Sequence, residues 1–205
     1  MRYAKIPEQT VRRLPIYLRA LSYWAELERT KISSKDLAES VGLNAGQIRK
    51  DFSYFGEFGT PGVGYDVDAL SLQIKKILKL DATKKVALVG VDNLGTAVLS
   101  YTGFDRYGLT IAAAFDAKRV GKKVKGIEIE DVSKLSSLKQ RGINMAIVAV
   151  PVGVAQQVVE ELVKAGVKGI INFAACHLVV PKRVKVTNID IGMDLASLPY
   201  YLPVS

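Results

Sequence analysis

A chain of 205 residues, of which 49% are hydrophobic, is long enough to bury one large core or two small ones. The formal charge of +9 favours a polyanionic partner, for which nucleic acid is the commonest candidate. One cysteine and one histidine exclude an intrachain disulfide, a multi-cysteine zinc site and a histidine metal cluster, so we expect no metal. No signal peptide or membrane-length apolar run is present, which predicts a cytoplasmic protein without a membrane partner.

Two stretches near the start have helical spacing. Residues 7–28 carry apolar side chains three and four positions apart, and Pro15 is expected to kink or split this helix. Ser33 or Ser34 can cap a second, short helix over residues 35–41.

A third helix is expected from Asn44 to about Phe55, with Gln47 placed as in a capping box. Two short helices joined by a tight turn favour a helix-turn-helix, whose second helix lies in the major groove of DNA. The apolar face of this helix consists of Ile48, Phe52 and Phe55, and the predicted DNA contacts are Gln47, Arg49, Lys50, Ser53 and Tyr54. The alternative is a small helical domain with a solvated basic face.

Residues 56–67 cannot continue a helix, because they contain four glycines and a proline. They favour a tight β-hairpin, and a hairpin that follows a recognition helix is the wing of a winged helix. A helix over residues 68–80 would complete the domain. The polar segment 81–85 is the natural boundary, so we predict a DNA-binding domain over residues 1–80.

Residues 84–116 predict a strand, a tight turn, a helix and a second strand. The apolar run before Gly90 is typical of a strand buried on both faces of a parallel sheet. The second strand ends at Asp116, about 20 residues beyond Gly95, which is the spacing expected of a ribose-binding acid in a dinucleotide fingerprint.

One position departs from that fingerprint. Asp92 stands where the middle glycine of G-x-G-x-x-G lets the backbone approach the pyrophosphate. A helix N-terminus attracts a negative charge by about 0.3–1 kcal/mol, so a nearby carboxylate can cancel that gain. Two interpretations stay open: a dinucleotide site, or a βαβ unit whose Gly90 and Gly95 serve only the turn and close helix packing.

The remaining chain continues a Rossmann-like alternation of strands and helices. Strands are expected at residues 127–129, 145–150 and 169–174, and helices at 132–139 and 154–165. Residues 184–189 and the tail 194–202 close the chain. Cys176 and His177 are neighbours, but adjacent side chains seldom point at each other, so we do not expect a nucleophilic pair.

Four segments of the chain form a specific combination: PEQTVRRLPIYLRAL, QIRKDFSYFGEFGTPGVGY, NFAACHLVV and NIDIGMDLASLPYYL. Together they resemble the Rex family of redox-sensing transcriptional repressors of bacteria, and the resemblance covers essentially the whole chain. It implies an α/β fold: a winged helix-turn-helix domain over residues 1–80, a Rossmann-like parallel-sheet domain over 81–190 and a swapped C-terminal helix over 191–205. It also implies a homodimer that binds palindromic operator DNA, reads the NADH to NAD ratio and releases the DNA when NADH binds.

The resemblance also assigns roles to single residues in the nucleotide site. Asp116 would accept hydrogen bonds from the adenosine ribose and favour NAD(H) over NADP(H), although Lys118 and Arg119 lie just beyond and can attract a 2′-phosphate. Tyr101 matches the family tyrosine near the nicotinamide. The pyrophosphate loop corresponds to Gly90, Val91, Asp92, Asn93, Leu94 and Gly95.

In the family, the state of that tyrosine couples to an aspartate of the partner subunit and an arginine of the DNA-binding domain, which correspond to Asp190 and Arg19. The expected wing contacts are Gly59, Thr60 and Gly62, and this chain has Pro61 where the family usually has a basic residue. Pro199 also lies inside the expected C-terminal helix, where a proline costs about 3 kcal/mol.

Three functions compete on these residues. The first is the NADH-sensing repressor, and the second is a Rex-like regulator that has lost or altered nucleotide sensing, for which Asp92 is the motive. The third, an NAD-dependent dehydrogenase, is disfavoured because His177 follows a strand in an expected loop and the chain has no substrate domain. We therefore expect no enzymatic activity.

Overall fold

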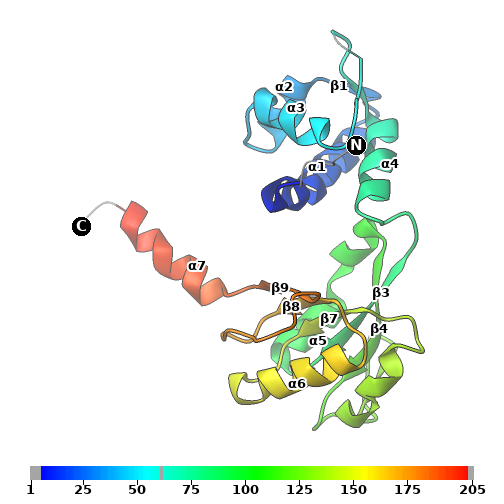
Figure 1. Cartoon of the computed structure of the whole chain (residues 1–205), viewed down its shortest axis with the longest axis vertical. Helices are drawn as coiled ribbons and strands as arrows, with labels where there is room; N and C mark the ends of the chain where they lie inside the picture. Colours follow the sequence, from blue (N-terminus) through cyan, green and yellow to red (C-terminus); the bar gives the residue numbers. More distant parts are fainter. Residues whose placement is uncertain (1–5, 61, 203–205) are drawn as a thin grey trace. The chain divides into compact units, whose positions relative to one another are not determined.

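The computed structural model describes residues 6–60 and 62–202. The chain divides into two compact units, Met1–Ala82 and Thr83–Ser205 (Figure 1). Within the described residues, no helix is long and apolar enough to cross a membrane, and no group of three or more His, Cys, Asp or Glu side chains could hold a metal ion.

The first unit is mainly helical. Helix α1 packs against α4, and α2 packs against α3, around buried residues that include Leu14, Leu18, Leu37 and Ile74. The elements are α1 (Glu8–Glu26), β1 (Lys31–Ile32), α2 (Ser34–Ser40), α3 (Ala45–Ser53), β2 (Tyr65–Asp66) and α4 (Val67–Ile77).

Pro15 does not divide α1, which continues as one helix from Glu8 to Glu26. The proline removes one backbone hydrogen bond. Leu14 precedes it, Tyr17 and Leu18 follow it, and all three are buried, so the same core holds the helix on both sides. The expected split of this helix is therefore wrong, and the expected kink stays a prediction.

The caps predicted for the next two helices are confirmed. Ser33 and Asp36 form a capping box at the start of α2, in which Ser33 Oγ accepts from the Asp36 N–H at 3.1 Å. Asn44 Oδ1 accepts from the Gln47 N–H at 2.8 Å at the start of α3. Gln47 does not complete a second capping box, because its side-chain amide donates to Asp51.

The turn that follows α3 contains less strand than the predicted hairpin. Thr60 and Gly64 form a single antiparallel bridge. Strand β2 pairs instead with β1, with Tyr65 opposite Ile32. Sequence analysis missed β1, since two residues are too few to show a period. Pro61, inside this turn, lies outside the described residues.

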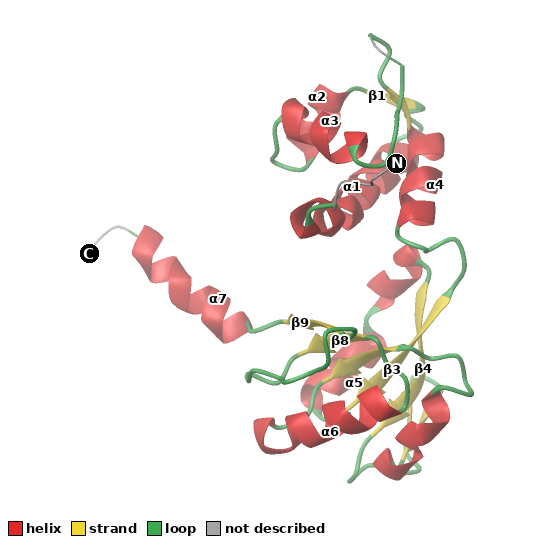
Figure 2. Cartoon of the chain, in the orientation of Figure 1, coloured by secondary structure: helices red, strands yellow, loops and turns green. Residues whose placement is uncertain are grey.

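The second unit is built on a seven-stranded sheet with the order β5-β6-β4-β3-β7-β8-β9. Figure 2 shows the strands in yellow and the helices in red. Neighbouring strands are parallel except for the pair β5 and β6. The strands are β3 (Lys84–Val89), β4 (Leu109–Phe115), β5 (Lys123–Val124), β6 (Ile127–Glu130), β7 (Met145–Val148), β8 (Gly169–Asn172) and β9 (Lys185–Asn188). The helices are α5 (Asn93–Ser100), η1 (Thr102–Tyr107), η2 (Val132–Leu138), α6 (Val152–Lys164), α7 (Ile191–Ser197) and η3 (Leu198–Tyr201).

Successive residues of β3 enter different cores, because side chains alternate across a strand. Ala87 and Val89 pack in the cluster that contains Val159 of α6. Leu88 belongs to the cluster on the other face, which Val98 of α5 contacts. Helices α5 and α6 thus cover opposite faces of the sheet, and the strand order reverses direction between β3 and β7, as in a doubly wound fold. The predicted fold class, a winged helix followed by a Rossmann-like sheet, is confirmed.

The end of the chain differs from the single C-terminal helix that the resemblance implied over residues 191–205. Helix α7 ends at Ser197, and a separate 3₁₀ helix, η3, continues with Pro199 in its first turn. A proline is tolerated there because the first N–H groups of a helix have no partner within it. Residues 203–205 of the predicted swapped segment lie outside the described residues.

Candidate functional site

Helix α3 separates its apolar and polar side chains as predicted. Ile48 and Phe52 are buried in the core of the first unit, whereas Arg49, Lys50 and Ser53 are exposed. Of the other residues predicted on this helix, Gln47, Tyr54 and Phe55 are half-buried. The exposed face therefore presents two positive charges and a hydroxyl group.

A groove of about 460 Å³ runs between α3, the turn that follows it and the start of α2. It brings together four of the residues predicted to contact DNA, namely Arg49, Ser53, Thr60 and Gly62. Arg49 Nη1 also donates to Ser34 Oγ at 3.0 Å across this groove. Gln47, Lys50, Tyr54 and Gly59 do not line it.

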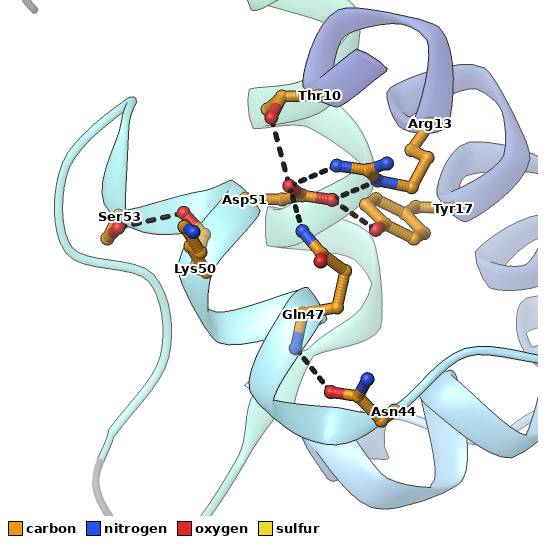
Figure 3. A network of polar contacts seen from close by, with 8 residues as sticks. All are labelled: Thr10, Arg13, Tyr17, Asn44, Gln47, Lys50, Asp51 and Ser53. Carbon is orange, nitrogen blue, oxygen red and sulfur yellow. Dashed lines mark hydrogen bonds and ion pairs between the residues drawn. The ribbon is translucent and has the colours of Figure 1, made fainter. Parts of the chain in front are cut away.

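The buried carboxylate of Asp51 is the feature of this unit that sequence reasoning missed. Its side chain is fully buried between α1 and α3 (Figure 3). Oδ1 accepts hydrogen bonds from Thr10 Oγ1 at 3.0 Å, Arg13 Nη2 at 2.8 Å and Gln47 Nε2 at 2.8 Å. Oδ2 accepts from Arg13 Nε and Tyr17 Oη, both at 2.5 Å. We call these five residues the Asp51 cluster.

The Asp51 cluster keeps its central carboxylate ionised. Burial alone would raise the pKa of Asp51, but the hydrogen bonds from Arg13, Tyr17, Gln47 and Thr10 outweigh it and lower the pKa to about 2. Burial and the bond to Asp51 raise the pKa of Tyr17, so this phenol stays protonated and donates. The only sequence signal was an acid between the apolar Ile48 and Phe52.

In the second unit, Gly90 and Gly95 hold the turn between β3 and α5. Gly90 has a φ of +92°, and a Cβ there would lie 2.3 Å from the Ala149 carbonyl oxygen. A Cβ on Gly95 would lie 2.0 Å from the Gly90 carbonyl oxygen. Neither position has room for a side chain, so the turn packs closely against β7 and brings the start of α5 onto the end of β3.

A cleft of about 590 Å³ opens at the carboxyl ends of β3, β4 and β7. In doubly wound sheets, ligands bind at this edge, where the strand order reverses. The cleft includes Gly90, Asp92, Asp116 and Lys118 from the predicted set. Residues that sequence reasoning did not propose complete it, mainly from η2 and α6: Val132, Ser133, Leu135, Ser136, Val154, Gln157, Val158 and Glu161. These lie far along the chain from the fingerprint, and no motif marks them.

Asp116 is buried at the end of β4 and binds backbone amides. Oδ2 accepts from the Val91 N–H at 2.8 Å, and Oδ1 accepts from the N–H groups of Lys118 at 2.7 Å and Arg119 at 3.1 Å. Burial acts to raise the pKa of Asp116, but these three bonds and the Arg119 charge lower it overall. The carboxylate therefore joins the fingerprint turn to the turn after β4.

The two cations beyond Asp116 differ in availability. Arg119 Nη1 donates to the Val91 carbonyl oxygen and, at 3.0 Å, to Thr96 Oγ1, so it is tied to the start of α5. Lys118 is exposed at the cleft. Of the two cations expected to attract a 2′-phosphate, only Lys118 therefore remains a candidate.

The other residues of the fingerprint turn take different positions. The Val91 side chain is fully buried, whereas Asp92, Asn93 and Leu94 are exposed. Asp92 is the N-cap residue of α5 with a φ of −73°, so this position does not need the left-handed conformation that favours glycine. Its side chain makes no capping bond and borders the cleft.

The three predicted switch residues are not brought together within one described unit. Tyr101 is 61% exposed, lies outside the cleft and packs edge-on against Phe104 at a ring distance of 5.1 Å. Asp190 caps α7, where its Oδ1 accepts from the Met193 N–H at 3.0 Å. Arg19 is exposed on α1 of the first unit. Their coupling stays a prediction.

The fold and the two sites define a class of protein, in which a winged-helix unit precedes a dinucleotide-type sheet. Two family models match the chain: "Putative DNA-binding protein N-terminus" over residues 5–53 and "CoA binding domain" over residues 81–176. The chain is 44% identical over 204 residues to the redox-sensing transcriptional repressor Rex of Brevibacillus brevis, across 98% of this chain and 99% of the relative.

Two solved structures are similar over nearly the whole chain. The crystal structure of RSP in complex with β-NAD+ and operator DNA has a TM-score of 0.90 at 34% identity, across 97% of this chain and 93% of that one. The structure of RSP with β-NADH has a TM-score of 0.85 at 33% identity, across 97% and 94%. The chain belongs to the Rex family of redox-sensing transcriptional repressors.

Proposed function

We propose that this chain is a DNA-binding transcriptional repressor that senses the NADH to NAD ratio and releases its operator when NADH binds. The observation that carries this proposal is the combination, in one chain, of an exposed basic recognition helix and a nucleotide cleft. The chain is similar over nearly its whole length to RSP, which has been solved with β-NAD+ and operator DNA. The protein acts by binding in the cytoplasm and needs no catalysis.

The DNA contacts are proposed to come from α3 and the turn that follows it. Arg49 and Lys50 are exposed on the helix, and positive side chains supply most of the affinity of such proteins for DNA. The groove beside Arg49 contains the hydroxyl groups of Ser34, Ser53 and Thr60, which can donate to phosphate oxygens, next to apolar side chains such as Phe58. The proposed contacts are Gln47, Arg49, Lys50, Ser53, Tyr54, Gly59, Thr60 and Gly62.

The nucleotide is proposed to lie in the cleft at the carboxyl edge of the sheet. Gly90 and Asp92, the N-cap residue of α5, line this cleft, so the pyrophosphate is proposed to lie at the N-terminus of α5. Asp116 also lines the cleft and is the proposed partner of the adenosine ribose. Asp92 borders the same cleft with its negative charge. That charge favours a second candidate function, a Rex-like regulator with lost or altered nucleotide sensing.

The C-terminal segment is proposed to make the homodimer. Every described residue from 191 to 202 is exposed, and seven of them have large apolar or aromatic side chains. Exposed apolar surface of this kind marks a protein interface. A helix swapped into a partner subunit would cover Ile191, Met193, Leu195, Leu198, Tyr200, Tyr201 and Leu202.

The response to NADH is proposed to act through a two-state dimer. A nucleotide that binds one arrangement more tightly shifts the population by its differential affinity, typically about 1–3 kcal/mol. The two recognition helices must match half-sites about one helical turn, or a multiple of it, apart, so a changed arrangement releases DNA. Tyr101, Asp190 of the partner copy and Arg19 are the proposed switch.

DNA binding is tested by selecting duplexes from a randomised pool with the purified protein. We expect a palindromic consensus. Reversal of Arg49 and Lys50 to glutamate should weaken binding and reduce the slope of log affinity against log salt by about 1 for each phosphate that the variant no longer neutralises. Unchanged affinity and slope in that variant would contradict the placement of the DNA on α3.

Nucleotide binding is tested by calorimetry with NADH, NAD+, NADPH and coenzyme A. NADH is expected to bind more tightly than the other three. An absence of NADH binding at millimolar concentration, in a protein that still selects a DNA consensus, would instead support the second candidate function.

A further inference from the structure

Five hydrogen bonds converge on one buried carboxylate between two helices of the DNA-binding unit (Figure 3). We propose that Asp51 is a positioning residue for DNA reading, which fixes the rotation of α3 against α1 and so the direction in which α3 presents Arg49 and Lys50. The proposal rests on the proposed DNA-binding function.

The donors on α1 are spaced to meet a single point. Thr10, Arg13 and Tyr17 lie three and four positions apart, which places them on one face of the helix. Arg13 donates two bonds as a fork, one to each oxygen of Asp51, and this planar arrangement fixes the direction as well as the distance of the contact. Asp51 thus has a defined orientation relative to α1.

The apolar contacts of α3 do not define that orientation equally well. Ile48 and Phe52 anchor the helix in the core, but apolar burial is non-directional. Hydrogen bonds weaken steeply when their angles change. Lys50 is the residue before Asp51, and Arg49 is one further back, so a rotation of α3 at Asp51 displaces both exposed cations together. Base edges and phosphates must be met at hydrogen-bond distance, so such a rotation weakens DNA binding.

Asp51 also orients the amide of Gln47, which lies one turn earlier on α3. A carboxylate can only accept, so the Gln47 amide nitrogen faces Asp51 at 2.8 Å. The Gln47 oxygen then points away from the carboxylate, as Figure 3 shows. In this orientation Gln47 offers an acceptor, which pairs with the amino group of adenine or cytosine in the major groove.

The test uses Arg13→Lys in the full chain. Lysine keeps the positive charge beside Asp51 but removes the two-bond fork. We expect the variant to fold, to keep the affinity of the wild-type protein for a scrambled duplex and its salt slope, and to bind a duplex selected by the wild-type protein at least about tenfold more weakly. Arg12→Lys is the matched control, because Arg12 pairs with Glu8 at an exposed site, and its selected-to-scrambled ratio should stay at the wild-type value.

Tyr17→Phe supplies a second, milder variant if Arg13→Lys does not fold. It removes one bond to Asp51 and keeps the ring that packs against Phe52. A smaller loss in the same selected-to-scrambled ratio is expected. Folded variants that keep the wild-type ratio, or that lose both affinities in proportion, would overturn the positioning role. A wild-type protein that prefers no duplex from the pool would instead overturn the proposed function.

Discussion

Each unit of the molecule contains one buried carboxylate that accepts several hydrogen bonds, but the donors differ. Asp51 in the first unit receives its bonds from side chains, and three of the donors lie 34 to 41 positions away in the sequence. Asp116 in the second unit receives its bonds from backbone N–H groups, two of them in the turn that follows it. The first carboxylate joins two helices, whereas the second shapes two loops.

The two units thus stabilise their binding surfaces in two ways, one through hydrogen bonds from side chains and the other through hydrogen bonds from the backbone. Backbone amides are present whatever the side chain, so the contacts of Asp116 depend on the path of the chain and on glycines that allow it. The contacts of Asp51 depend on the identity of four side chains, and the loss of the Asp51 carboxylate leaves all four without this acceptor. We therefore expect changes at Asp51 to cost more than changes at Asp116.

The largest effect is expected for Asp51→Asn. An amide at this position cannot balance the Arg13 charge, and its NH₂ group faces other donors. Breaking a buried ion pair costs about 3–5 kcal/mol of unfolding free energy. Trp24 is the only tryptophan and lies in α1, so its fluorescence during urea denaturation reports on this unit. Asp81→Asn, at an exposed position, is the control, and an equal loss in both variants would contradict the account.

The free energy of unfolding of the first unit is expected to fall at acid pH, because Asp51 is ionised in the folded state. The pKa of Asp51 is lowered to about 2 in the folded state, whereas an unfolded aspartate titrates near about 3.9. Its stabilisation is therefore complete above about pH 5 and is lost as the pH falls through about 4 and then through about 2, by about 2–3 kcal/mol in total. Urea denaturation of wild type and Asp51→Asn should show a stability difference that shrinks over this range. A constant difference would contradict the assignment.

Among the substitutions proposed in the second unit, Gly95→Ala is expected to cause the largest loss of stability. The added methyl group would meet the Gly90 carbonyl oxygen, and overpacking of this kind costs about 1–3 kcal/mol. Nucleotide affinity should fall with it, because the fingerprint turn would move. Gly153→Ala in α6 is the matched control: nothing lies within 4 Å of its Cβ position, so stability should be unchanged or higher. Circular dichroism during denaturation and NADH calorimetry measure the two effects.

Asp116→Asn should cost less than Asp51→Asn, about 1–2 kcal/mol. An asparagine oxygen can still accept from part of the amide set, and Lys118 is exposed, so water can reach that turn. Thermal unfolding followed by circular dichroism tests this value. A loss as large as that at Asp51 would remove the distinction between the two carboxylates.

The smallest effect is expected at the fingerprint turn itself. Asp92→Gly should tighten NADH binding by about 0.3–1 kcal/mol, since it removes a negative charge beside the N-terminus of α5. Calorimetry on the two proteins makes the comparison. Weaker binding in the variant would show that the Asp92 side chain assists the nucleotide rather than opposing it.

The parts of the molecule that sequence could predict are those governed by local rules. The caps at Ser33 and Asn44, the turn at Gly90 and the acid at Asp116 follow from neighbouring residues, and the structure has each of them. Helix α1 continues through Pro15 because tertiary packing overrides the local preference. The α6 wall of the cleft lies at residues 152–164, and no local pattern links it to the fingerprint turn.

The Asp51 cluster shows why the rest could not be predicted. Thr10, Arg13 and Tyr17 look like ordinary residues of an amphipathic helix, and an aspartate inside a helix usually faces solvent. Only the packing of α3 on α1 brings them within hydrogen-bond distance. The short strands β1 and β5 could not be predicted for a different reason, because a strand of two residues shows no periodic pattern.

The most direct test of the account is the fluorescence anisotropy of a labelled, selected duplex bound to the wild-type protein during titration with NADH or NAD+. We expect NADH to lower the anisotropy to the value of free DNA, while NAD+ at the same concentration leaves the complex intact. An anisotropy that NADH does not change, or that both nucleotides lower equally, would contradict the claim that this protein releases its operator in response to NADH.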